Sequence, residues 1–170
     1  ALNKKYNTKV GKIVIDAMNV EDICYKISSD KCPSGPSSGE YVSNGSNVGG
    51  TMYINWTSMD VGILAHEIFH GYQDLNNQGQ ASIHNEVQAR LFATGVQRQA
   101  YATGMSQLVP QGNLLPNVFT YNVEKVLLGS YSMTNLQYLE DNFKSHFGGY
   151  NNLKVRIEGQ TDLYGTLKNN

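Results

Sequence analysis

The sequence predicts an α+β fold, in which a small mixed or antiparallel sheet packs on one helix and further helices lie behind. Two observations lead to this prediction. Residues Thr51–Trp56 alternate between apolar and polar side chains, as in a half-buried strand, and a long amphipathic helical pattern follows them. Further helical patterns come later, whereas strand-like runs are few. The chain has 170 residues, so we expect one domain over residues 1–170.

The composition is that of a folded domain and argues against two kinds of protein. Hydrophobic residues make up 40% of the chain, enough for a core that needs neither metal nor disulfide. The 13 Lys and Arg residues are balanced by 14 Asp and Glu residues without a dense basic run, which argues against nucleic-acid binding. No apolar stretch approaches the roughly 18 residues of a membrane span. The oligomeric state is left open.

The first part of the chain is expected to hold one strand and one long loop. Residues 12–20 contain the β-branched run Ile13-Val14-Ile15, which predicts a strand. Residues 30–50 are mostly Ser, Gly, Pro and Asn, which predicts a surface loop that overhangs the cleft. Cys24 and Cys32 lie around the start of this loop. They are either a disulfide, as in extracytoplasmic proteins, or two separate thiols.

The compartment is inferred from composition and from the first residue. The chain begins at Ala1 and is rich in Asn, Ser, Tyr and Gly. We therefore expect a secreted or extracytoplasmic protein whose signal peptide has been removed.

Three helices are predicted, over Met59 to Leu75, Ser82 to about Ala102, and Thr134 to Phe147. Thr57 or Ser58 can cap the first helix. Pro110 and Pro116 interrupt the pattern between the second helix and the third. Residues 153–157 are a candidate for a further short strand.

The first helix contains the motif His66-Glu67-Ile68-Phe69-His70, or HExxH. Two histidines four residues apart project from nearly the same side of a helix, so both can bind one Zn²⁺ ion. Glu67 is rotated away from that ion, and its carboxylate can instead reach a water bound to it, as a general base must. The apolar residues of this helix lie opposite the histidines, which therefore face another surface. The alternative is a pair of surface histidines.

A catalytic zinc site needs a third protein ligand and leaves its fourth position to water. Asp74 lies on the same helix, where three ligands would strain a tetrahedral site, and Asn76 stands where an extended motif has its third histidine. Glu86 and His84 open the second helix, and Glu86 lies nearer to its Ala-rich apolar stripe. Glu86 could instead form a surface ion pair with Arg90. The predicted metal ligands are His66, His70 and Glu86, with His84 and Asp74 as alternatives to Glu86.

The HExxH helix, the polar turn and a second helix that opens with Asn85-Glu86 resemble the zincin metallopeptidases. The resemblance is to the gluzincin branch, whose third zinc ligand is a Glu on a following helix, and it covers residues 51 to about 100. It implies that the strand Thr51–Trp56 forms the upper edge of the cleft and pairs with extended substrate. Gluzincins have an Asp one turn after the third ligand to support a zinc-binding histidine. Here that position is Arg90, so Asp74 or Asn85 would have to take this role.

The resemblance implies a zinc endopeptidase that acts on a peptide or protein substrate. Zn²⁺ would activate water and polarise the scissile carbonyl, while Glu67 would take the proton from the water and pass it to the leaving amine. A Tyr or His would stabilise the oxyanion, and His146 and Tyr150 are both candidates. Two alternatives remain: a zincin-fold protein that binds a partner or peptide without turnover, and a structural zinc site, which usually has four protein ligands.

Overall fold

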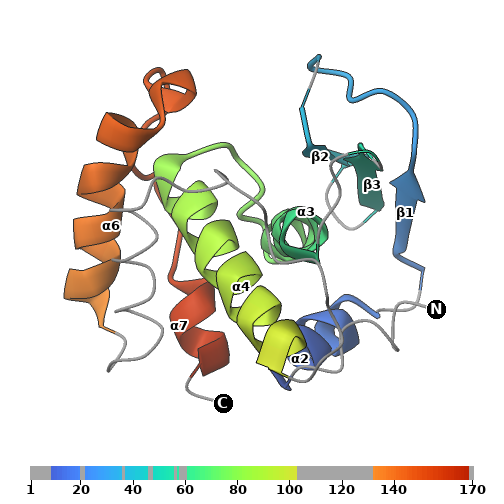
Figure 1. Ribbon diagram of the computed structural model, residues 1–170, viewed down its shortest axis with the longest axis horizontal. Helices are drawn as coiled ribbons and strands as arrows, with labels where there is room; N and C mark the ends of the chain where they lie inside the picture. The colour runs from blue at the N-terminus through green and yellow to red at the C-terminus, as the bar shows by residue number, and fades with distance from the viewer. Residues whose placement is uncertain are drawn as a thin grey trace.

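Helices and one three-stranded sheet make up the part of the protein described by the computed structural model in Figure 1. The structure describes residues 9–19, 22–35, 37–45, 48–55, 57, 61–102 and 132–168. In chain order the elements are α2 (Lys9–Met18), β1 (Cys24–Ser28), β2 (Gly39–Ser43), β3 (Gly49–Ile54), α3 (Val61–Leu75), α4 (Ile83–Ala102), α6 (Met133–His146), the 3₁₀ helix η1 (Gly148–Tyr150) and α7 (Leu163–Lys168). The predicted α+β class is confirmed.

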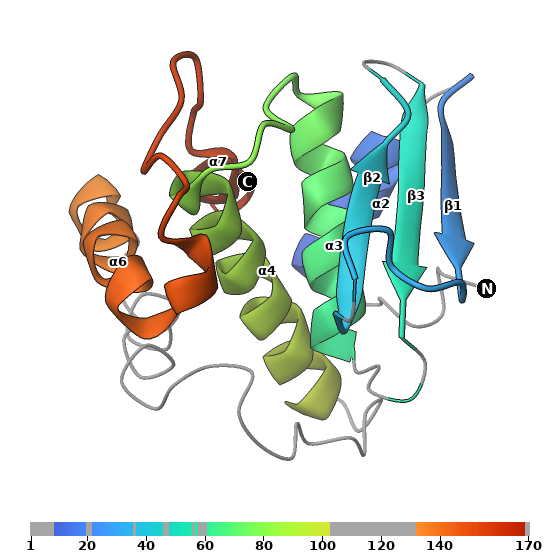
Figure 2. The ribbon, with the colours of Figure 1, turned by 90° about the horizontal axis from the view of Figure 1, so that it is seen from above.

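The sheet is mixed, with β3 in its centre. β3 pairs in parallel with β1 and antiparallel with β2, in the order β1-β3-β2. Met52 and Ile54 of β3 are buried, and the sheet packs on α3 through β2 and β3. Figure 2 shows the resulting layers: the sheet, then α3, then α4, then α6.

The core lies on both sides of α3, because this helix is enclosed between the sheet and α4. Phe69 of α3 stacks on Phe92 of α4 with a distance of 4.9 Å between ring centroids. Ala89 and Ala93 of α4 are also buried, and their small side chains let the two helices approach closely. This close approach brings the polar residues of α3 and α4 that flank the contact within reach of each other.

Residues 12–20 were predicted to form a strand, and that prediction is wrong. Residues 12–18 belong to the helix α2, in which Val14 and Met18, four residues apart, are buried in the core, and Val20 lies outside the described residues. Lys12 and Asp16 form an ion pair with the same spacing. The helical period of burial therefore outweighs the local preference of the β-branched run for a strand.

The expected loop over residues 30–50 is only partly a loop. It contains β2 and the beginning of β3, and the strand β1 just before it was not predicted. Residues 153–157 form no strand. The carbonyl groups of Lys154 and Val155 instead accept hydrogen bonds from the first N–H groups of α4, with N···O distances of 2.9 and 2.8 Å. Cys24 and Cys32 are both free thiols, so the disulfide alternative does not hold.

The other elements agree with the sequence within a few residues. The strand predicted at residues 51–56 is β3, and the three predicted helices are α3, α4 and α6. Trp56, the helix start at residues 58–60, and Pro110 and Pro116 lie outside the described residues. Within the described ranges, every helix is too short or too polar to cross a lipid bilayer.

Candidate metal centre

Two neighbouring helices bring together the three residues predicted as metal ligands. α3 supplies His66 and His70, and the first turn of α4 supplies Glu86. The Nε2 atoms of the two histidines are 3.0 Å apart. Glu86 Oε2 lies 3.4 Å from His66 Nε2, and Glu86 Oε1 lies 3.4 Å from His70 Nε2. One nitrogen from each histidine and one carboxylate oxygen lie within 4.8 Å of one another, close enough to hold one ion.

This arrangement fits a zinc ion in its spacing and in its chemistry. Two ligands bound at 2.0–2.1 Å with tetrahedral angles lie about 3.3 Å apart, close to the separations of 3.0 and 3.4 Å found here. Two histidines and one Glu are also the ligand set of a common class of catalytic zinc site. In addition, Glu86 Oε2 is buried without a hydrogen-bond partner, an arrangement that a bound cation would relieve.

Without a bound cation, a proton on His70 supplies positive charge at this site. Burial acts to lower the pKa of His70, but the nearby carboxylates of Glu86 and Glu67 outweigh burial and raise it to about 9. The pKa of Glu86, which burial alone would raise, is held well below its usual value by the two histidines. Burial lowers the pKa of His66, and the charge of His70 lowers it further. At neutral pH the metal-free site therefore holds a charged His70, an ionised Glu86 and a neutral His66.

Gln73 supports His70 from behind, and the sequence analysis did not select it. Its side chain is fully buried. Gln73 Oε1 lies 2.8 Å from His70 Nδ1, and Gln73 Nε2 donates a hydrogen bond of 3.0 Å to the backbone carbonyl of Asn85. Because His70 Nδ1–H donates to this amide, His70 Nε2 is the nitrogen that faces the metal site. The spacing of three residues from His70 along the helix is the signal that could have identified Gln73.

Asp74 and Asn85, which the sequence suggested as supports of a zinc-binding histidine, make other contacts with their side chains. Asp74 accepts hydrogen bonds of 2.8 Å from the hydroxyls of Tyr41 and Ser43, and so ties the end of α3 to β2. The Asn85 side chain donates to backbone carbonyls in the turn before α4, including that of Gln80 at 2.9 Å. Neither Asp74 nor the Asn85 side chain contacts a histidine of the metal centre through a hydrogen bond in the described residues.

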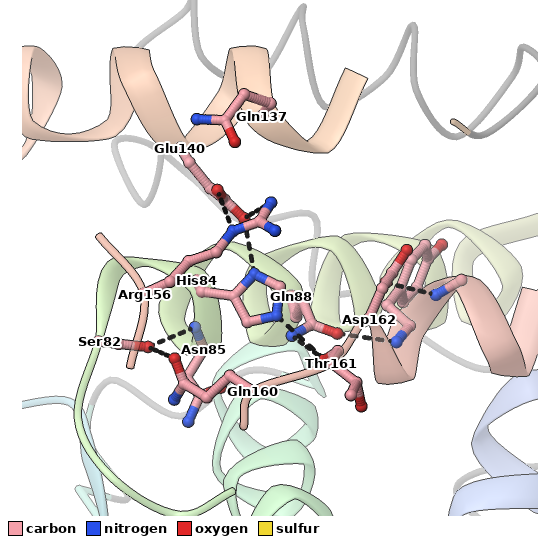
Figure 3. A network of polar contacts seen from close by, with 12 residues as sticks. Ser82, His84, Asn85, Gln88, Gln137, Glu140, Arg156, Gln160, Thr161 and Asp162 are labelled. Carbon is pink, nitrogen blue, oxygen red and sulfur yellow. Dashed lines mark hydrogen bonds and ion pairs between the residues drawn. The ribbon is translucent and has the colours of Figure 1, made fainter. Parts of the chain in front are cut away.

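His84 belongs to a separate buried network, shown in Figure 3, and not to the metal centre. Its Nδ1 lies 2.6 Å from Glu140 Oε1, and its Nε2 lies 3.0 Å from the carbonyl oxygen of Thr161. Arg156 binds both oxygens of Glu140, at 2.8 and 3.0 Å. Both ring nitrogens of His84 are thus engaged inside this network and neither faces His66 or His70. His84 is therefore unsuited to bind a metal, and the alternative ligand set with His84 is wrong.

A cavity of about 280 Å³ opens beside the metal centre. It is lined by Ser37, Ser38, Gly39, Gly62, Ile63, His66, Glu67, Arg90, Ala93, Thr94, Gln97 and Tyr150. Glu67, only 6% exposed, belongs to its wall. A Cβ atom at Gly39 would lie 2.8 Å from Glu67 Oε1, so a larger residue there would require this carboxylate to shift.

The strand that borders this cleft is β2, not the strand expected from the resemblance. β3 corresponds to the predicted strand at residues 51–56 and lies in the centre of the sheet, whereas β2 is an edge strand. Gly39 opens β2 and lines the cleft together with Ser37 and Ser38. Residues 37–39 of the 30–50 segment thus line the cleft, and the expectation that this segment overhangs it stays a prediction.

Of the two candidates for an oxyanion donor, only Tyr150 is among the residues that line the cleft. His146 Nδ1 instead lies 2.8 Å from the carbonyl oxygen of Asn142 in its own helix. Burial and the charge of Glu86 raise the pKa of Tyr150, while Arg90 acts in the opposite direction. The Tyr150 phenol is therefore protonated at neutral pH and able to donate a hydrogen bond.

Comparison with known proteins gave no match among protein-family models, curated proteins or solved structures. The function has to be inferred from the site itself.

Proposed function

We propose that this protein is a zinc-dependent endopeptidase of the gluzincin type, with His66, His70 and Glu86 as metal ligands. The observation that carries the proposal is the convergence of one ligand atom from each of these residues within 4.8 Å of one another. The adjoining cleft supports a catalytic role over a structural one, because a structural zinc site is usually closed by a fourth protein ligand.

Glu67 is the proposed general base. A bound zinc ion would act as a Lewis acid toward the scissile carbonyl and make water more acidic. Glu67 follows the first ligand in the chain, and its carboxylate lies in the wall of the same cleft. It accepts a proton from the attacking water and returns it to the leaving amine.

Tyr150 is the proposed hydrogen-bond donor to the oxyanion. It lines the cleft together with His66 and Glu67. Because the pKa of Tyr150 is raised, its hydroxyl keeps its proton at neutral pH. A fixed donor in a largely buried site stabilises negative charge as that charge develops in the transition state.

The substrate is proposed to be a peptide in extended conformation. The edge strand β2 begins at the cleft with Gly39, and an edge strand offers backbone groups to which an extended peptide can add.

The test combines metal analysis with a peptide-library cleavage assay. We expect one zinc ion per chain and measurable cleavage in the wild-type protein. Glu67→Gln should keep the zinc and lose cleavage by at least about 10²-fold, because the amide cannot accept the proton. Glu158→Gln, an exposed substitution of the same kind, is the matched control and should cleave like wild type.

If the protein binds zinc but cleaves no library peptide, the proposal that it is an endopeptidase is wrong. That result would favour the second candidate, a protein that binds a partner or peptide without turnover. The observation against that candidate is the buried Glu67 carboxylate in the cleft wall, which a binding site has no chemical need to keep.

A further inference from the structure

Arg90 fastens the segment after α6 to the helix that carries Glu86. Arg90 lies one turn after Glu86 on α4. Its guanidinium carbon is 4.4 Å from the ring centroid of Phe147, 5.5 Å from that of Phe143 and 6.0 Å from that of Tyr150. A guanidinium group is attracted to aromatic faces, most strongly where water is excluded. Arg90 therefore packs the end of α6 and η1 against α4.

The three rings also contact each other. The centroids of Phe143 and Phe147 are 4.6 Å apart, and those of Phe143 and Tyr150 are 5.2 Å apart. The backbone bonds of this turn are local: Tyr150 N–H donates to the Phe147 carbonyl at 3.1 Å, and Leu153 N–H donates to the Tyr150 carbonyl at 3.0 Å. These bonds shape the turn. The Lys154 and Val155 carbonyls after it are bound to the start of α4, and Arg90 packs the turn itself against the next turn of that helix.

Arg90 also acts on the Tyr150 hydroxyl. Its guanidinium carbon lies 6.0 Å from the Tyr150 ring centroid, and Arg90 acts to lower the pKa of this tyrosine against the effect of burial. A phenol oxygen that accepts one hydrogen bond still has its own O–H to donate. A guanidinium beside Tyr150 can therefore orient the phenol without using its O–H, and both residues line the cleft that contains His66 and Glu67.

We infer that Arg90 is a positioning residue that holds the Tyr150 hydroxyl beside the metal centre, so that one helix sets both the third ligand and the oxyanion donor. This inference rests on the proposed hydrolytic function. Arginine suits the role because its planar group can stack on the rings and donate a hydrogen bond at the same time, which a lysine ammonium cannot do as well.

A double-mutant cycle in the zinc-loaded protein tests the inference. Tyr150→Phe should lower kcat by about 10²-fold, as loss of an oxyanion donor does. Arg90→Met should lower kcat by a similar factor with little change in KM or zinc content. If Arg90 acts through Tyr150, the double variant should be no slower than Tyr150→Phe alone. Arg98→Met, a substitution on the same helix at a residue that does not line the cleft, is the control and should retain wild-type kcat.

Hydrogen exchange provides a second measurement that does not depend on turnover. The amides of residues 147–153 should exchange faster in Arg90→Met than in wild type or Arg98→Met, because the turn has lost its aromatic contacts with Arg90. Arg90→Lys keeps the charge and allows the same comparison should Arg90→Met not fold.

The inferred role of Arg90 would be overturned if the effects of Arg90→Met and Tyr150→Phe on kcat multiply in the double variant and exchange at residues 147–153 is unchanged in Arg90→Met. Zinc-loaded wild-type protein without any turnover would instead overturn the proposed function. The exchange measurement would then decide about Arg90 by itself.

Discussion

At His70 a proton would compete with the proposed metal ion. Its Nε2 faces His66 and Glu86, and its pKa is raised to about 9 in the metal-free site, where the carboxylates of Glu86 and Glu67 outweigh the effect of burial. A metal ion can bind only after this proton has left, because the cation needs the lone pair of the same nitrogen. In the metal-free site, the charged His70 therefore supplies the positive charge that the proposed cation would supply.

This competition predicts a pH dependence of zinc binding. Since His70 is protonated below about 9, zinc affinity should rise by about tenfold per pH unit between neutral pH and that value, and then level off. Calorimetry in two buffers with different ionisation enthalpies should show close to one proton released per zinc at neutral pH. Zinc affinity that stays constant over this range would contradict the assignment of the proton to His70.

The same raised pKa has the opposite effect on the metal-free protein. Protonated His70 paired with Glu86 stabilises the folded state fully below the ordinary pKa of 6.5, and this contribution is lost as the pH rises through about 9. Alkaline conditions should therefore favour zinc binding while weakening the fold that lacks zinc.

Gln73 should affect zinc affinity although it does not touch the metal. Gln73→Met removes the amide that orients His70 and the hydrogen bond from this amide to the Asn85 carbonyl. We expect zinc affinity to fall by about 10–100-fold, measured by competition with a chelator of known affinity. Gln137→Met, at an exposed position of α6, should bind zinc like wild type. Undiminished affinity in Gln73→Met would show that the position of His70 does not depend on this amide.

Local periodicity could predict the ligands that lie on helices, but not the residues that surround them. The helical positions of His66, His70 and Glu86 follow from spacing and from the apolar faces of two adjacent helices. Tyr150 comes from a segment more than sixty positions further along, and only tertiary packing shows that it, and not His146, reaches the cleft. The place of Gly39 in the cleft wall could not be predicted either, because it also depends on tertiary packing.

At the scale of elements, contacts with the C-terminal part of the chain hold the first turn of helix α4 in place. The N–H groups of Ile83 and His84 donate to the carbonyls of Lys154 and Val155, and the His84 side chain lies between Glu140 and Thr161. These contacts fix the turn that carries Glu86 two residues later. The position of the third ligand therefore depends on residues far from it in sequence.

Breaking this network should destabilise the whole fold. Glu140→Gln removes the carboxylate that pairs with both His84 and Arg156, and leaves the Arg156 guanidinium facing an amide. Because Glu140 is buried, we expect the free energy of unfolding to fall by about 3–5 kcal/mol, measured by chemical denaturation. The neighbouring exposed substitution Asp141→Asn is the control, with an expected change within about 0.5 kcal/mol. A loss for Glu140→Gln no larger than that of the control would contradict the role of this network.

The errors in predicting elements have a common physical origin. A β-branched run predicted a strand where α2 forms, because the burial of Val14 and Met18 against the core has the helical period. A segment rich in Ser and Gly predicted a loop where β2 forms, because pairing with β3 supplies the backbone hydrogen bonds that decide the matter. Both outcomes depend on long-range contacts, which local composition does not contain.

At the scale of the molecule, the metal centre lies at the contact between α3 and α4, the two central layers in Figure 2. The α+β class and the central position of α3 could be predicted, since an alternating strand leads into a long amphipathic helix. The mixed strand order β1-β3-β2 could not, because the strand that borders the cleft is set by pairing across the sheet. A cation bound here would join two layers and so stabilise the fold by mass action.

The zinc content of the purified, dialysed protein tests the central claim most directly, with Glu86→Gln beside wild type. The account predicts one zinc ion per wild-type chain and loss of most of that zinc in Glu86→Gln, because the amide oxygen replaces a charged ligand at the point where the two histidines converge. Full zinc occupancy in Glu86→Gln, or a wild-type protein that binds no zinc, would contradict it.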